Sequence, residues 1–297
     1  MRKAVVAGQF YQKEKDELLE QIESCFKHKL GKKLSKTKAK SKSNSKSNFI
    51  GLISPHAGYV YSGPCATHGF AFISKTNLPE TIILLGPNHT GNAQAEFSLS
   101  LESFETPLGI IKNNEELGKE LIKISNGLIQ HDETAHKSEH SLEVQLPFLQ
   151  YIYQRAKKEL KIIPLIISTQ DYDKCIKVAS LLSSIIKKDS CIGIIASSDF
   201  THYGPGYGFM PFSYNKETKK NLYDLDKKAI TEVLNLNPEA FFQKAIKTTI
   251  CGFAPIVVLT ELSRILKKQA KLLKYYTSGD ISNDYSSAVG YGSIAFS

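Results

Sequence analysis

The chain has 297 residues, with 38 Lys and Arg against 29 Asp and Glu, so its formal net charge is +9. The length suits one large or two small domains, and a 41% share of hydrophobic residues excludes a globally disordered chain. No apolar run reaches the roughly 20 residues that cross a bilayer, and we see no secretory signal. Five scattered cysteines without a C-x-x-C pair favour reduced thiols, so we expect a cytoplasmic protein.

The excess positive charge comes from one segment. Residues 27–48 contain nine lysines and no acidic residue, so the rest of the chain is formally neutral. The Lys/Ser/Asn-rich part, at about 29–48, has too few apolar residues to offset the entropy of ordering, which predicts a flexible insertion. A nucleic-acid-binding arm is the alternative interpretation. No aromatic residue interleaves with the lysines to stack on bases, so we do not expect a nucleic-acid partner.

Buried strands and helices alternate along the chain. In chain order the pattern predicts a helix over 16–27, a strand over 49–54, a helix over 63–74, a strand over 81–85, a less buried strand over 96–101, helices over 114–125 and 139–154, a strand over 161–167, a helix over 172–187, a strand over 190–196, a long loop over 203–216, helices over 218–234, 238–246 and 252–268, and strands over 272–278 and 288–296. This order indicates a single α/β domain over 1–297, a three-layer sandwich with a central, mostly parallel sheet flanked by helices.

Three of the predicted strands end in a polar turn that carries a histidine. These histidines are His56, His89 and His202, and Asp199 lies in the same turn as His202. Ligands of open α/β sheets bind beyond the carboxyl ends of the strands. If the three strands are parallel, these side chains lie at one edge of the sheet, and we expect them to share a site.

The residue types leave three chemistries open. Two imidazoles and one anionic ligand suit Fe(II) with open coordination positions, and Zn(II) with three protein ligands and a water is equally compatible. Alternatively, Asp199 orients His202 as a general base without a metal.

Cys251 and His140 are further candidates for this site. Cys251 precedes the apolar helix over 252–268, and a helix N-terminus favours the thiolate form, although a buried structural cysteine is the alternative. Glu139 and Glu143 are explained as acids in the first turn of the helix over 139–154. A histidine there opposes the helix dipole, so we expect His140 to line the pocket.

Several motifs in one order resemble the MEMO family, whose bacterial and archaeal members are labelled component B of the AmmeMemoRadiSam system. The motifs are AGQFY (7–11), SPHAGYVYSG (54–63), GPNHTG (86–91), EHSLEVQLPFL (139–149), KIIPLII (161–167), SSDFTHYG (197–204), LD (225–226) and TICGFAPI (249–256). The resemblance covers the chain from about residue 4 to its end. It implies a fold like that of class III (LigB-type) extradiol dioxygenases.

The resemblance also implies roles for individual residues. His56 and His89 match the two metal-binding histidines of the dioxygenases, and His202 matches their acid/base histidine, with Asp199 beside it. Cys251 stands where the dioxygenases have a glutamate ligand. Thiolate is softer than carboxylate and is itself oxidised beside iron and oxygen, which argues against ring cleavage.

We therefore expect a metal-dependent redox enzyme that acts on a small molecule. Its metal would be Fe(II), with Zn or Cu as alternatives, held by His56, His89 and Cys251, while His202, Asp199 and His140 serve catalysis. Two other functions stay open: a non-catalytic pocket that binds a peptide or an anionic or aromatic ligand, with Tyr59, Tyr61 and Tyr203 nearby, and a zinc hydrolase. The system label implies AMMECR-type and radical-SAM proteins as partners.

Overall fold

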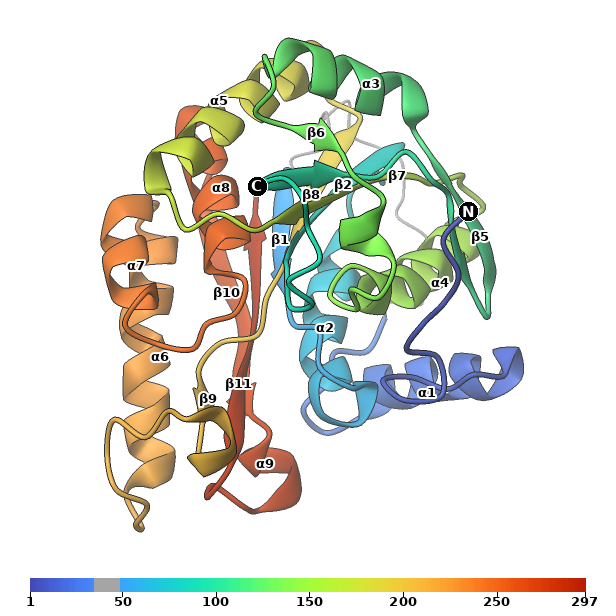
Figure 1. Ribbon diagram of the computed structural model, residues 1–297. Coiled ribbons are helices and arrows are strands. Elements are labelled where there is room, and N and C mark those ends of the chain that lie inside the picture. Colours follow the sequence, from blue (N-terminus) through green and yellow to red (C-terminus); the bar gives the residue numbers. More distant parts are fainter. Residues whose placement is uncertain (35–48) are drawn as a thin grey trace.

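The computed structural model describes residues 1–34 and 49–297. Most of the predicted insertion at about 29–48 therefore lies outside the described residues. A central sheet carries helices on both faces, which confirms the predicted α/β sandwich (Figure 1). The sheet combines strands from the beginning, the middle and the end of the chain.

The centre of the sheet is parallel, as predicted. Its strands lie in the order β1 (Gly51–Ser54), β8 (Ile192–Ser197), β2 (Thr81–Pro87) and β7 (Lys161–Ile167). Antiparallel strands continue it on both sides: β11 (Ala288–Phe296) and β10 (Ala270–Thr277) beyond β1, and β3 (Phe97–Leu99) beyond β7. The shorter strands are β4 (Phe104–Thr106), β5 (Gly109–Asn113), β6 (Gln130–His131) and β9 (His202–Tyr203).

Helices cover both faces of this sheet. One layer consists of α1 (Lys15–Lys27), α2 (Tyr59–Ile73) and α4 (Leu146–Ala156). The opposite layer consists of α3 (Glu115–Ile124), α5 (Tyr172–Lys188), α6 (Thr218–Leu234), α7 (Pro238–Ala245) and α8 (Phe253–Ile265). The short α9 (Gly279–Ser282) lies between β10 and β11 in the chain.

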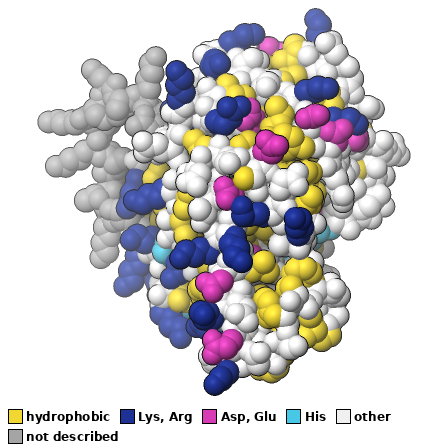
Figure 2. Space-filling model, turned by 90° about the vertical axis from the view of Figure 1, so that its left-hand side faces the viewer, with side chains coloured by type: hydrophobic (Ala, Val, Ile, Leu, Met, Phe, Trp, Pro, Cys, Tyr) yellow, Lys and Arg dark blue, Asp and Glu magenta, His cyan; other side chains and the backbone are white. Residues whose placement is uncertain are grey.

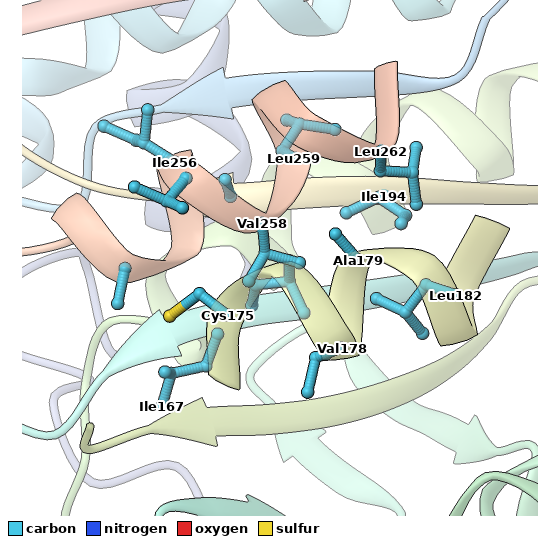
Figure 3. Close-up of a cluster of buried hydrophobic side chains, with 14 of the residues drawn as sticks. Ile167, Cys175, Val178, Ala179, Leu182, Ile194, Ile256, Val258, Leu259 and Leu262 are labelled. Atoms are coloured by element: carbon cyan, nitrogen blue, oxygen red, sulfur yellow. The ribbon is translucent and has the colours of Figure 1, made fainter. Parts of the chain in front are cut away.

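Alternate residues of the central strands face the two helical layers. On β2, Ile83 and Leu85 belong to one apolar cluster, and Ile82 and Leu84 belong to the other. This period of two follows from the pleat of a strand. In the first cluster the buried side chains of α5 and α8 meet over the sheet (Figure 3). Because both faces are buried, the central strands are continuous apolar runs.

Several predicted elements differ from the structure. The helix expected over 63–74 begins at Tyr59, and the loop expected over 203–216 contains a 3-10 helix over Pro205–Tyr207. The helix expected over 139–154 begins only at Leu146, after a 3-10 helix over Glu143–Gln145, because Pro147 suits a first helical turn and not an interior. The strand expected over 96–101 is the shorter β3. It is fully buried rather than less buried, and Phe97 and Leu99 belong to the apolar cluster that also contains side chains of α3 and α5.

A buried ion pair ties the N-terminus to the loop before α4. Arg2 pairs with Glu143, and both side chains are almost inaccessible to solvent. Arg2 also donates to the backbone carbonyls of His136 and Glu139. Glu143 does lie in the first turn of the 3-10 helix over Glu143–Gln145, but its side chain also faces Arg2 and the backbone amides of the N-terminal segment.

Charge on the surface is mixed. Figure 2 shows Lys and Arg side chains spread over one face, with Asp and Glu side chains among them.

Within residues 1–34 and 49–297, helices that are both long and apolar enough to cross a membrane are absent.

His136 makes the stability of the fold sensitive to acid. Its buried ring donates from Nε2 to the carbonyl of Ser98, and Nδ1 has no hydrogen-bond partner among the described residues. A second proton on Nδ1 would thus be buried without an acceptor. Burial lowers the pKa of His136 from 6.5 to about 4. Between these values the unfolded chain binds a proton that the folded chain does not, so stability falls as the pH falls.

We expect this group to lower the free energy of unfolding by about 2 kcal/mol between pH 7.5 and pH 5. His136→Gln should remove that part of the pH dependence. Urea unfolding at both pH values measures it, and His131→Gln at an exposed position is the matched control. The same pH dependence in wild type and His136→Gln would contradict the prediction.

Candidate metal centre

Three histidine-bearing turns lie together at one edge of the sheet. β1, β8 and β2 are neighbouring parallel strands, and His56, His202 and His89 follow their carboxyl ends. The ring centroids of His56 and His89 are 5.1 Å apart. His56 is buried, whereas the side chain of His89 is 30% exposed and thus reachable from solvent.

Cys251 joins two of these histidines. Its Sγ lies 3.2 Å from Nε2 of His56, and the ligand atoms of His56, His89 and Cys251 all lie within 4.8 Å of one another. Cys251 stands two residues before α8, and Gly252 lets the chain pass close to β8. A Cβ on Gly252 would lie 2.5 Å from the carbonyl oxygen of Ser197.

The pKa of the Cys251 thiol is shifted in the direction opposite to the prediction. We expected the nearby helix N-terminus to lower its pKa. Burial instead raises the pKa of Cys251, and the neighbouring His89 offsets this only in part. Removing the thiolate from water is the largest cause of this shift. Cys251 would therefore release a proton on binding a metal ion.

Glu139 is the partner of His89. Its Oε1 accepts from Nδ1 of His89 at 2.9 Å, and its Oε2 accepts from the backbone N–H of His89 at 2.7 Å. Burial alone would lower the pKa of His89, but the hydrogen bonds to Cys251 and Glu139 raise it to about 10. The interpretation of Glu139 as a first-turn acid was wrong, because no helix begins there and the carboxylate is buried against His89.

His140 lies beside both His56 and His89. Its ring stacks on His89 at 4.6 Å between centroids and meets His56 edge-on at 5.4 Å. Phe10 from the N-terminal segment packs on it at 4.7 Å. Burial lowers the pKa of His140 to about 4, so the ring is neutral at physiological pH.

Asp199 and His202 have separate partners. Asp199 is buried and accepts from the backbone N–H of His56 at 2.9 Å. The Nδ1 of His202 lies 3.0 Å from the carbonyl of Thr249, two residues before Cys251. Within the described ranges no hydrogen bond joins Asp199 to His202. We predicted that Asp199 orients the ring of His202. In the structure Thr249 orients this ring instead.

The ligand atoms fit a transition metal. Imidazole and thiolate suit Fe, Zn and Cu, whereas Mg and Ca prefer oxygen ligands. A second group, His89 with Glu139 and His140, also lies within 4.8 Å. Both oxygens of Glu139 already accept N–H groups of His89 and Ser141. The group that contains Cys251 is thus the better candidate.

The family model for Memo-like proteins matches residues 2–295. This chain belongs to the Memo-like protein family. It is 38% identical over 300 residues to a MEMO1 family protein from Methanocaldococcus jannaschii, covering 99% of this chain and 98% of that protein. A MEMO1 family protein from Nitrosopumilus maritimus is also 38% identical, over 299 residues, covering 100% and 99%. These findings confirm the family that the motifs indicated.

A solved structure shares the fold of this Memo-like protein. The crystal structure of an uncharacterized protein from Escherichia coli K12 matches with a TM-score of 0.56. The two chains are 12% identical over 83% of this chain and 99% of the other. At that identity the similarity concerns the fold alone.

Sequence reasoning missed the residues behind the histidines of this Memo-like protein. Glu139 contacts His89, and Ser197 contacts His56, although 50 and 141 residues separate the partners. In the sequence, only the apolar residues around Glu139 and Ser197 indicate that these two side chains are buried. Of the tyrosines that we expected near these histidines, Tyr59 and Tyr203 are buried, and their hydroxyls donate to the carbonyls of Val144 and Phe212.

The close approach at Gly252 is testable. Gly252→Ala should push the segment that carries Cys251 away from β8, because the new Cβ meets backbone and Ser198 atoms at about 2.5 Å. Overpacking of this kind costs about 1–3 kcal/mol. We expect a lower free energy of unfolding in urea, with Gly206→Ala unchanged as control, since a Cβ there meets nothing within 4 Å. Equal stability of the two variants would contradict the packing argument.

Proposed function

We propose that this Memo-like protein is a metal-dependent redox enzyme that holds Fe(II) at His56, His89 and Cys251 and acts on a small molecule. The proposal rests on one observation: these three ligand atoms lie within 4.8 Å of one another at the carboxyl edge of a parallel sheet. Ligand sites of open α/β sheets occur at that edge. The partly exposed His89 gives a substrate access to this position.

In this proposal some side chains bind the metal ion and another transfers protons. Bound Fe(II) would supply redox chemistry and open coordination positions. Cys251 binds as thiolate after it loses its proton. His202 donates from Nδ1 to the carbonyl of Thr249, so its Nε2 is left to accept or return a proton. His140 is neutral and lies against the rings of both histidine ligands.

A zinc hydrolase is the second candidate, because a Cys/His ligand set suits Zn(II) as well as Fe(II). In that case His202 would activate the water, since the Asp199 carboxylate is buried and engaged with His56. The metal itself therefore separates the two functions.

The protein should be purified without oxygen and chelators, and its metals measured by mass spectrometry. We expect near-stoichiometric iron in the wild type and its loss in the His56→Ala/His89→Ala double variant. His131→Ala, at an exposed histidine outside the site, should retain the metal. Zinc with the same pattern of loss would favour the hydrolase.

Two results would contradict a metal centre at this position. One is a wild type that holds no metal and binds none when iron or zinc is added. The other is a double variant that keeps as much metal as the wild type. Circular dichroism of the double variant checks that it is folded.

A further inference from the structure

Glu139 receives three N–H groups on two oxygens. Oε1 accepts from Nδ1 of His89 and from the backbone of Ser141, each at 2.9 Å, and Oε2 accepts from the backbone of His89 at 2.7 Å. A carboxylate accepts only, so Nδ1 of His89 keeps its proton here, and Nε2 is the nitrogen at which a metal ion would replace a proton. An amide at this position would turn its NH₂ group against one of the three donors.

An uncharged hydrogen-bond network determines which ring nitrogen of His56 carries the proton. Nε2 of Gln145 donates to the carbonyl of Pro55 at 2.9 Å and to Oγ of Ser197 at 2.8 Å. The hydroxyl of Ser197 uses its single proton on the carbonyl of Ser141 at 2.7 Å. The contact of 2.9 Å between Ser197 Oγ and His56 Nδ1 must then be donated by the ring. Nε2 of His56 is therefore unprotonated, and it faces Cys251.

We propose that Glu139 and Ser197 are positioning residues that fix the tautomers of His89 and His56, so that both rings present Nε2 to the metal. This inference rests on the proposed function. The two supports differ in charge, because His89 has a buried carboxylate behind it and His56 has a hydroxyl. A carboxylate behind a metal-binding histidine makes the ring a stronger ligand. His89 thus depends more on its support than His56 does.

The first test measures the affinity for Zn²⁺ alone by competition with a chelator, using metal-free protein. Glu139→Gln should weaken binding by about 10–100-fold, and Ser197→Ala by about tenfold. Glu143→Gln is the matched control, because Glu143 is a buried carboxylate of the same loop that contacts Arg2 and no histidine. It should lower the melting temperature but leave the Zn²⁺ affinity within about threefold.

The second test reads the tautomers directly. With ¹⁵N-labelled histidine, long-range ¹H–¹⁵N spectra of the Zn²⁺-loaded protein should show a protonated Nδ1 on both His89 and His56. Glu139→Gln should perturb the pattern of His89 and leave that of His56, and Ser197→Ala should do the reverse. A merely structural defect would move both patterns together. In metal-free protein the pattern of His56 should already be present and should be lost in Ser197→Ala.

The outcomes separate this inference from the proposed function. If the wild type binds no Zn²⁺, the metal centre fails, and the metal-free spectrum of His56 still decides whether Ser197 sets its tautomer. If the wild type binds Zn²⁺ and both variants bind it within about twofold, with unchanged tautomers, the positioning roles are wrong while the metal centre stands.

Discussion

The parallel pairing of β1, β8 and β2 is the constraint on which the site depends. Because these strands run in the same direction, their carboxyl ends share one edge, and the turns that follow them must lie together. The two apolar clusters on either face hold the strands in register. The turns that carry His56, His89 and His202 are thus placed by a rigid core, and they can remain polar.

Burial of charge is the main free-energy cost of this arrangement. The carboxylates of Glu139 and Glu143 are both inaccessible to solvent, and each is surrounded by N–H donors. Arg2 links the two, because it pairs with Glu143 and donates to the backbone of Glu139. The N-terminal segment therefore packs against this loop, although none of its residues belongs to the group of His56, His89 and Cys251.

The protonation state of Cys251 governs the charge beside His56 and His89. Burial keeps the thiol protonated until a cation replaces the proton. The negative charge that remains next to the histidines in the metal-free state is that of Glu139, which lies behind His89 and not among the ligands. The group of His56, His89 and Cys251 offers nitrogen and sulfur atoms, which softer metals prefer, whereas Mg and Ca prefer oxygen.

The sequence by itself determined the alternation of strands and helices, the parallel core and the three histidines at strand ends, because these follow from local periodicity and from turns directly after apolar runs. Tertiary structure decided the rest. It paired Glu139 with His89, Asp199 with the backbone of His56, and Ser197 with the ring of His56. It also started α4 at Leu146 and buried β3. Partners 50 to 143 residues apart are selected by packing and desolvation, and no local pattern in the chain records them.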